Sequence, residues 1–308
     1  TQNCPRAEIR SLLFATTYGE PVVIPSMQQT AAWLSIWDTD TGREVAARDP
    51  EILVQLGDPA SLPDAIAEAA LRTLVYRIAK GDRDRVSDHD QIRRLMRPAL
   101  AAVVRELWRR HGKVEDVRSL LVKCIHNGRL RDLVDIAYEA ATTIGEDRLC
   151  RVFGGRAVLD LAPPPLLKAY VAHVRQHFKT LPATMVWEVA EAAFPGELSA
   201  DDIATFLDTL EEQHSEMYFE RFLRSLEDKP VPFGDLLHIL TALARRLPED
   251  VDGPRHEHDD LAGSLAALCR TVYARLGTVE PPLELCNAFL RVTAFERMGS
   301  ERPGQVVV

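Results

Sequence analysis

Apolar residues recur at three- and four-residue steps along almost the whole chain, which is the spacing of one face of an α-helix. One such stripe comprises Val114, Val117, Leu120, Leu121, Cys124 and Ile125. The next comprises Leu130, Leu133, Val134, Ala137 and Ala141. Asn127-Gly128 separates them, and we expect Gly128 to end the first helix in a left-handed C-terminal cap. Residues 114–144 are therefore predicted to form an antiparallel helical hairpin.

Helix-start signals support the same fold class. Ser26 with Gln29 and Thr41 with Glu44 have capping-box spacing, and Ser199 with Asp202 is a weaker version. Prolines tolerated at helix starts stand at 50, 63, 98, 165 and 182. The one strand-like run, 22–24, is short and is closed by a proline. Helices are predicted near 6–16, 26–38, 42–49, 50–56, 63–80, 88–95, 98–111, 114–126, 129–143, 146–160, 164–178, 182–194, 200–213, 215–227, 232–247, 257–276 and 282–298.

The fold class is therefore all-α. Helix pairs follow one another about every 30 to 40 residues, which predicts a degenerate α-solenoid of stacked helical hairpins. A compact multi-helix bundle is the alternative. We expect an N-terminal helical segment at 1–81, basic helical hairpins at 82–160, and an acidic helical-repeat segment at 161–308 that continues the preceding one. Polar joints are predicted at 81–88 and 248–255.

Composition narrows the function classes. Hydrophobic residues make up 46% of the 308 residues and charged residues 27%, which excludes collagen-like and wholly disordered chains. The net charge of −9 argues against a generic nucleic-acid binder. The five cysteines are scattered, which favours reduced thiols and a cytoplasmic location. No apolar run is long enough for a membrane span, and no membrane partner is expected.

Charges are segregated along the chain. The segment 91–113 carries a basic set, and 180–220 carries ten acids without lysine or arginine. These two surfaces are candidate docking sites for a nucleic acid and a basic partner; the alternative is that both are solvated helix faces. The candidate contacts are Arg93, Arg94, Arg97, Arg105, Arg109 and Arg110, and Asp201, Asp202, Asp208, Glu211, Glu212 and Glu216.

Motifs of catalysis are missing from the sequence. The only Gly-Lys pair, Gly112-Lys113, has Leu107 where a phosphate-binding loop needs glycine. Phe153-Gly154-Gly155-Arg156 follows no strand and is predicted to be a bend between helices. No Cys-x-x-Cys, His-Glu-x-x-His or Gly-x-Ser-x-Gly occurs. We therefore expect no catalytic residue, no cofactor and no metal.

Two histidine pairs are candidate metal ligands. His256 and His258 stand beside carboxylates in the run 256–260, and would be the site of an all-α metal-dependent enzyme. On a helix, residues two apart point in different directions, so this run more simply forms an acidic first turn. His173 and His177 have the i, i+4 spacing of two ligands but lack an evident third. A half-buried helix face is the simpler interpretation.

Trp33 and Trp37 are four residues apart and are predicted to share one helix face. Packing in the core is the simpler interpretation of these two residues and of Trp108. A partner-facing aromatic patch is the alternative. Cys124 and Cys269 lie on apolar stripes and are predicted to be buried core thiols.

Two stretches resemble a known family. One is VVIPSMQQTAAWLSIWDTDTGREVAARDPEILVQLGDPASLP (22–63), and the other is ELWRRHGKVEDVRSLLVKCIHNGRLRDLVDIAYEAA (106–141). They resemble the helical-repeat region that follows the nucleotidase in bacterial NACHT-type STAND NTPases. The motif residues are Pro25, Ala32-Trp33-Leu34, Asp49-Pro50-Glu51-Ile52-Leu53, Gly57-Asp58 and Leu62-Pro63, and later Leu120-Leu121 and Gly128-Arg129-Leu130.

The resemblance implies structural roles for these residues, since none is a catalytic group. It implies a sensor that holds a nucleotidase inactive until a trigger binds, in antiviral defence or in transcriptional regulation. The chain lacks the nucleotidase and an effector, and is expected to be a piece of a longer protein or a relative that lost the motor. The partner is then another protein or a covalently linked NTPase module. Nucleic-acid binding through 91–113 remains the alternative.

Overall fold

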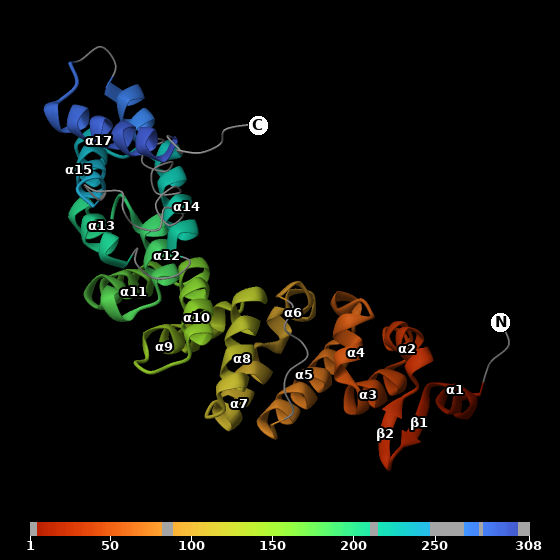
Figure 1. Ribbon diagram of the computed structural model, residues 1–308. Coiled ribbons are helices and arrows are strands. Elements are labelled where there is room, and N and C mark those ends of the chain that lie inside the picture. The colour runs from red at the N-terminus through yellow and green to blue at the C-terminus, as the bar shows by residue number, and fades with distance from the viewer. Residues whose placement is uncertain (1–4, 82–88, 210–214, 247–267, 277–279, 301–308) are drawn as a thin grey trace, which may run out of the picture. The chain divides into compact units, whose positions relative to one another are not determined.

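The computed structural model describes residues 5–81, 89–209, 215–246, 268–276 and 280–300 (Figure 1). Within these ranges the chain is helical apart from one two-stranded sheet and the connecting segments, so the predicted all-α class is confirmed. The chain divides into two compact units, 1–166 and 167–308. The three-segment division expected from the sequence stays a prediction.

Unit 1 begins with a short helix and a β-hairpin, and continues with helices. These elements are α1 (Arg6–Leu13), β1 (Phe14–Thr17), β2 (Glu20–Val23), α2 (Gln28–Leu34), α3 (Thr39–Arg48), α4 (Pro50–Gln55), α5 (Asp64–Ala79), α6 (His89–Leu95), α7 (Ala101–His111), α8 (Glu115–Asn127), α9 (Val134–Thr142) and α10 (Arg148–Leu161). Short 3-10 turns precede α2, α5, α7 and α9. The α8–α9 pair is the helical hairpin predicted at 114–144.

Helices in unit 1 pack mainly against helices one or two places along the chain. α3 packs on α2, α4 and α5, and α10 packs on α8 and α9. Sequential contacts of this kind occur in stacked helical hairpins and in helix bundles alike, so the predicted solenoid and the alternative bundle both stay predictions.

Unit 2 follows the same order of contacts. It holds most of α11 (Pro164–His177), and then α12 (Ala183–Ala193), α13 (Ala200–Phe206), α14 (Ser215–Asp228), α15 (Phe233–Ala244) and α17 (Leu283–Ser300). Residues 268–276 are also helical. α12 packs on α14, α13 on α15, and α15 on α17. Trp187 is fully buried between Phe219 and Phe222, with ring centroids 4.7 and 5.5 Å away.

The helix predicted at 6–16 is wrong at its end. Residues 14–17 form β1, which pairs antiparallel with β2 so that Phe14 faces Val23. The two-residue turn Tyr18-Gly19 has φ angles of 54° and 84°. Positive φ at both central residues is the geometry whose twist matches a β-hairpin. The apolar run before Thr16 fits a helix locally, and the β-branched threonines and the tyrosine–glycine turn override it.

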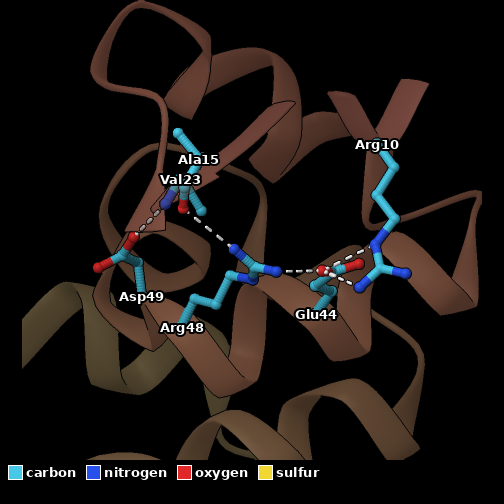
Figure 2. A network of polar contacts seen from close by, with 6 residues as sticks. All are labelled: Arg10, Ala15, Val23, Glu44, Arg48 and Asp49. Atoms are coloured by element: carbon cyan, nitrogen blue, oxygen red, sulfur yellow. Dashed lines mark hydrogen bonds and ion pairs between the residues drawn. The ribbon is translucent and has the colours of Figure 1, made fainter. Parts of the chain in front are cut away.

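Side chains of α3 and of Asp49, the residue between α3 and α4, hold the β-hairpin in place (Figure 2). The backbone N–H of Val23 donates to Asp49 Oδ2 at 2.7 Å, and Arg48 Nη1 donates to the carbonyl of Ala15 at 3.3 Å. The Arg48 guanidinium also lies 4.7 Å from the centroid of the Phe14 ring. Glu44 joins Arg48 to Arg10 of α1. One stretch of α3 therefore anchors both α1 and the sheet.

Of the three predicted capping boxes, only the one with the weakest sequence signal is formed. Ser199 forms the capping box with Asp202 at the start of α13, as predicted. The capping boxes predicted at Ser26 and Thr41 are wrong. Ser26 lies inside a 3-10 turn before α2, and Thr41 is itself bonded by the N-cap Asp38. The Asp38 carboxylate accepts from both the N–H and the hydroxyl of Thr41, so the cap lies three residues earlier than expected.

At the end of α8, the residue with left-handed backbone conformation stands one position later than predicted. Gly128 has φ −81°, and Arg129 has φ 50°. The N–H of Leu130 bonds the carbonyl of Ile125, and the N–H of Arg129 bonds the carbonyl of His126, which together make a Schellman motif. Gly128 is needed for a different reason. A Cβ at this position would lie 2.8 Å from Met96 Cβ and 2.9 Å from the Cys124 carbonyl oxygen.

This geometry predicts that Arg129→Gly stabilises the protein. Glycine occupies the left-handed region without the steric penalty of a side chain, and we expect a gain of about 0.5–1 kcal/mol. Gly128→Ala, one residue earlier, should destabilise because its Cβ collides with Met96. Urea unfolding followed by circular dichroism measures both changes. A loss of stability in Arg129→Gly would contradict the assignment of Arg129 as the strained cap residue.

Ion pairs between helices follow the spacing of the helical layers. Several polar contacts join residues 34 positions apart, namely Arg6–Asp40, Arg10–Glu44, Arg72–Glu106 and His126–Asp160. Others are separated by 36 (Asp58–Arg94), 30 (Arg105–Asp135, Glu191–Arg221) and 38 (Asp208–Arg246) positions. These separations agree with the helix-pair spacing expected from the sequence. Other pairs are closer in sequence, such as Glu51–Arg77 at 26 positions and Arg118–Glu146 at 28, so the predicted solenoid repeat stays a prediction.

Candidate interaction surfaces

Most arginines of the candidate basic surface contact carboxylates of the same unit. The ion pairs are Arg94–Asp58 (2.7 Å), Arg97–Asp64 (2.8 Å), Arg105–Asp135 (2.8 Å) and Arg110–Glu106 (3.1 Å). Arg97 also donates to the carbonyls of Ala60 and Leu62. Arg94, Arg97 and Arg105 therefore join successive helical segments, whereas the Arg110–Glu106 pair lies within α7.

Hydrogen bonds in this part of unit 1 lower the pKa of three carboxyl groups. The hydrogen bond from Arg105 lowers the pKa of Asp135, and the bond from Arg72 lowers the pKa of Glu106. The Ser61 hydroxyl, followed by the Arg94 guanidinium, lowers the pKa of Asp58. Because the pKa is lowered in the folded state, the stabilisation is present above the unfolded pKa and is lost as pH falls through the folded one.

Arg93 and Arg109 differ from the other four arginines. Both are exposed, and neither forms an ion pair within the part of the chain that the structure describes. Arg94 and Arg110 are exposed as well, with 53% and 67% of their side-chain surface accessible, but each forms an ion pair. The solvent-facing charge of the predicted basic surface is therefore carried by Arg93 and Arg94 on α6 and by Arg109 and Arg110 on α7.

The candidate acidic surface is dispersed over unit 2. Asp201 contacts His238 at 3.0 Å, Asp202 caps α13, and Asp208 pairs with Arg246 and with Lys179. Glu211 and Glu212 lie outside the described residues, and Glu216 lies in the first turn of α14. The three aspartates that are described each have a contact within unit 2.

The motif residues near the N-terminus take structural positions. Pro50 is buried at the first position of α4. A Cβ on Gly57 would lie 3.2 Å from Ala32 Cβ, so this glycine allows the end of α4 to pack closely on α2. Asp58 accepts from the Ser61 hydroxyl and pairs with Arg94. The Ala-Trp-Leu and Gly-Asp parts of the motif therefore lie next to each other.

Trp33 and Trp37 lie at the surface, so their predicted core position is wrong. Their exposed fractions are 42% and 74%, and Leu34 between them is half-buried. The rings stack, with centroids 6.5 Å apart and planes 23° from parallel. The buried face of this helix is formed instead by small residues, Ala31, Ala32 and Ser35. Their size lets α2 approach its neighbours and leaves the indoles outside.

Trp108 on α7 is arranged differently. It is half-buried against a small core cluster that includes Cys150 and Phe153. The Arg118 guanidinium lies 4.8 Å from the centroid of its ring and forms an ion pair with Glu146. An internal cation therefore covers this indole.

Neither histidine pair is shown to be a metal site. His173 and His177 stack with ring centroids 4.4 Å apart, and His177 Nδ1 lies 2.9 Å from the His173 carbonyl oxygen. Among the described residues, no group of three or more His, Cys, Asp or Glu side chains is placed to hold a metal. The run from His256 to Asp260, with His258, lies outside the described residues.

The glycine pair at 154–155 lies inside α10, so the predicted bend is wrong. A Cβ on Gly154 would lie 2.7 Å from the Ala137 carbonyl oxygen and 2.9 Å from the Ala141 backbone nitrogen. The glycine therefore lets the backbones of α9 and α10 approach closely. Helical propensity disfavours glycine here, and the tertiary contact overrides that preference.

The described cysteines are free thiols, and the predicted burial of Cys124 and Cys269 is confirmed. Cys150 is also buried. Burial, with a smaller contribution from Glu146, raises the pKa of the Cys150 thiol from 9.0 to about 12. Because the unfolded thiol ionises first, this group lowers the free energy of unfolding as pH rises from about 9 towards 12.

We expect Cys150 to resist alkylation in the folded protein. The thiolate is the reactive species, and this thiol is both protonated and covered. Iodoacetamide at about pH 8.5 should label the half-buried Cys286 first and Cys150 only after urea is added. Peptide mass spectrometry measures both positions in one sample. Equal labelling rates without denaturant would refute the protected environment of Cys150.

No protein-family model, curated protein or solved structure was found to match the chain. Within the described residues, no helix has the length and apolar character needed to cross a bilayer.

Proposed function

We propose that this chain is a non-enzymatic helical-repeat module that acts by binding a protein partner. The observation that carries the proposal is the exposed, stacked pair formed by Trp33 of α2 and Trp37 of the turn that follows it. Aromatic side chains of this size are enriched at the centres of protein interfaces. They stand on helices whose sequential layers resemble those of repeat proteins, which bind partners over extended surfaces.

We further propose that the module is the sensor part of a bacterial NACHT-type STAND NTPase that works in signalling or antiviral defence. The resemblance in 22–63 and 106–141 supports this, as does the close approach of Gly57 to Ala32 within the first motif. The buried, free thiols of Cys124, Cys150 and Cys269 fit a reducing compartment and support a cytoplasmic location.

The coding sequence upstream of Thr1 tests the second proposal. We expect it to continue in frame into a strand, a Gly-x-x-x-x-Gly-Lys-Ser/Thr loop and a helix, which is the phosphate-binding unit of a nucleotidase. An upstream region without such a unit would overturn the STAND assignment. The proposal that the chain binds a protein partner would then depend only on binding measurements.

A further inference from the structure

The two edges of the β-hairpin differ in how their outward backbone groups are satisfied. The N–H of Ile24 bonds the carbonyl of Leu13, so every second residue from these two pairs inside the hairpin, and the residues between them direct their backbone groups outwards. On β2 the outward residues are Pro21, which has no N–H, and Val23, whose N–H is bonded by Asp49. The β2 edge therefore offers no N–H to a further strand.

The β1 edge leaves one residue open. Its outward residues are Phe14, whose N–H bonds the carbonyl of Arg10, and Thr16. Among the described residues, no group bonds the N–H or the carbonyl of Thr16, which is exposed. The turn end of the hairpin lies beyond α1 and α3, so a further strand can reach this edge (Figure 1). An unpaired N–H and carbonyl on one extended residue form a template for another strand.

This edge is complementary to itself. In an antiparallel pair, two residues directly opposite each other exchange both of their N–H···O=C bonds. Two β1 strands related by a two-fold axis place Thr16 opposite Thr16 of the second copy, so that both bonds form. No residue of β1 is charged, and threonines opposite each other are a favourable pair. Unit 1 as a whole carries no net charge, so it does not repel its copy.

The same pairing gives a role to Tyr18. This turn residue is fully exposed and has φ 54°, a conformation that glycine and asparagine adopt at lower cost. A side chain that is fully exposed returns none of that cost through burial. With Thr16 opposite Thr16 of the second copy, Tyr18 comes opposite Phe14 of that copy. Aromatic pairs across neighbouring strands stabilise a sheet, and strained residues are often retained for function.

From these observations we propose that β1 is a self-association edge. Two copies of the chain pair antiparallel through β1, centred on Thr16, and form one sheet in the order β2, β1, β1, β2. The inference goes beyond the proposed binding of a protein partner, and it uses different residues from Trp33 and Trp37.

Sedimentation velocity over a wide range of concentrations tests the inference. We expect a monomer–dimer equilibrium for the unmodified chain. Thr16→Pro removes the outward N–H and no bond inside the hairpin, and should raise the dissociation constant at least about tenfold, since the dimer loses two hydrogen bonds. Thr16→Ala is the matched control and should change the constant much less, because the N–H stays.

Tyr18→Asn is a second variant with opposite effects on folding and on association. Asparagine suits the left-handed turn position, so the monomer should become more stable to urea. The dimer should become weaker, because the contact with Phe14 of the second copy is lost in both halves. Urea unfolding, at a concentration where the chain is monomeric, measures the first effect, and sedimentation measures the second.

Two results would overturn the inference. One is a monomeric chain at every concentration, which would leave the β1 edge to a strand of another protein or to solvent. The other is the same dissociation constant for Thr16→Pro and Thr16→Ala, which would place the dimer contact elsewhere. Circular dichroism establishes that each variant is folded.

Discussion

Gly154→Ala is expected to destabilise the protein by about 2–3 kcal/mol, although alanine is the better helix former. The added Cβ would lie 2.7 Å from the Ala137 carbonyl oxygen and 2.9 Å from the Ala141 nitrogen, which are backbone atoms. Backbone atoms cannot turn aside as a flexible side chain does, so α9 and α10 must separate. Urea unfolding followed by circular dichroism gives the change in free energy.

Gly234→Ala is the matched control for this substitution. Gly234 also lies in a helix, α15, but a Cβ there meets no atom within 4 Å. Without a collision, the better helix propensity of alanine should stabilise the protein by about 0.5–1 kcal/mol. Opposite signs for the two glycines are the expected result. If both substitutions stabilise, the close approach of α9 and α10 is wrong.

Trp187→Ala is expected to produce the largest loss, about 3–5 kcal/mol, because it removes a fully buried indole from an aromatic cluster. Phe219 and Phe222 pack on the indole, and Phe194 in turn packs on Phe222. The measurement is again urea unfolding, here followed by circular dichroism and by near-ultraviolet signals of the aromatic rings.

Two further substitutions show how much of this loss in stability comes from the burial of the ring. Trp187→Phe should cost much less, since it keeps a ring in the cluster and removes an indole N–H that has no hydrogen-bond partner among the described residues. Trp37→Ala makes the same change as Trp187→Ala at a site that is 74% exposed, and should cost less than about 1 kcal/mol. Similar losses for Trp187→Ala and Trp37→Ala would contradict the burial difference between them.

The sequence predicts the helices well because a helix that buries one face has apolar residues at three- and four-residue steps, which a short stretch of sequence reveals. The stripes around Leu120 and Ala137 suffice to place α8 and α9, and Pro50 marks the start of α4. The hairpin at 14–23 is harder to predict because its strands are stabilised by distant residues. Arg48, the last residue of α3, and the following Asp49 bond its backbone, and no residue near Phe14 in the sequence indicates these contacts.

The candidate surfaces depend even more on tertiary contacts. The rings of Trp33 and Trp37 lie side by side as their spacing predicts, although α2 ends before Trp37, and only the burial of Ala31 and Ala32 shows that the indoles are outside. The basic segment looks like a docking surface in sequence, because its carboxylate partners lie about a helix pair away. The spacing of the two tryptophans also predicted the alternative, a partner-facing aromatic patch, and that interpretation stays a prediction.

The ion pairs between residues 34 positions apart have a consequence for how such a chain evolves. A charge on one layer is matched by a charge on the next, so substitutions at Arg72 and Glu106 should covary among homologues while the residues around them drift. Deletion of one residue from a helix would misalign the following charges, whereas duplication of a whole layer would preserve their register. If the predicted solenoid is correct, we expect homologues to differ in length by whole helix pairs.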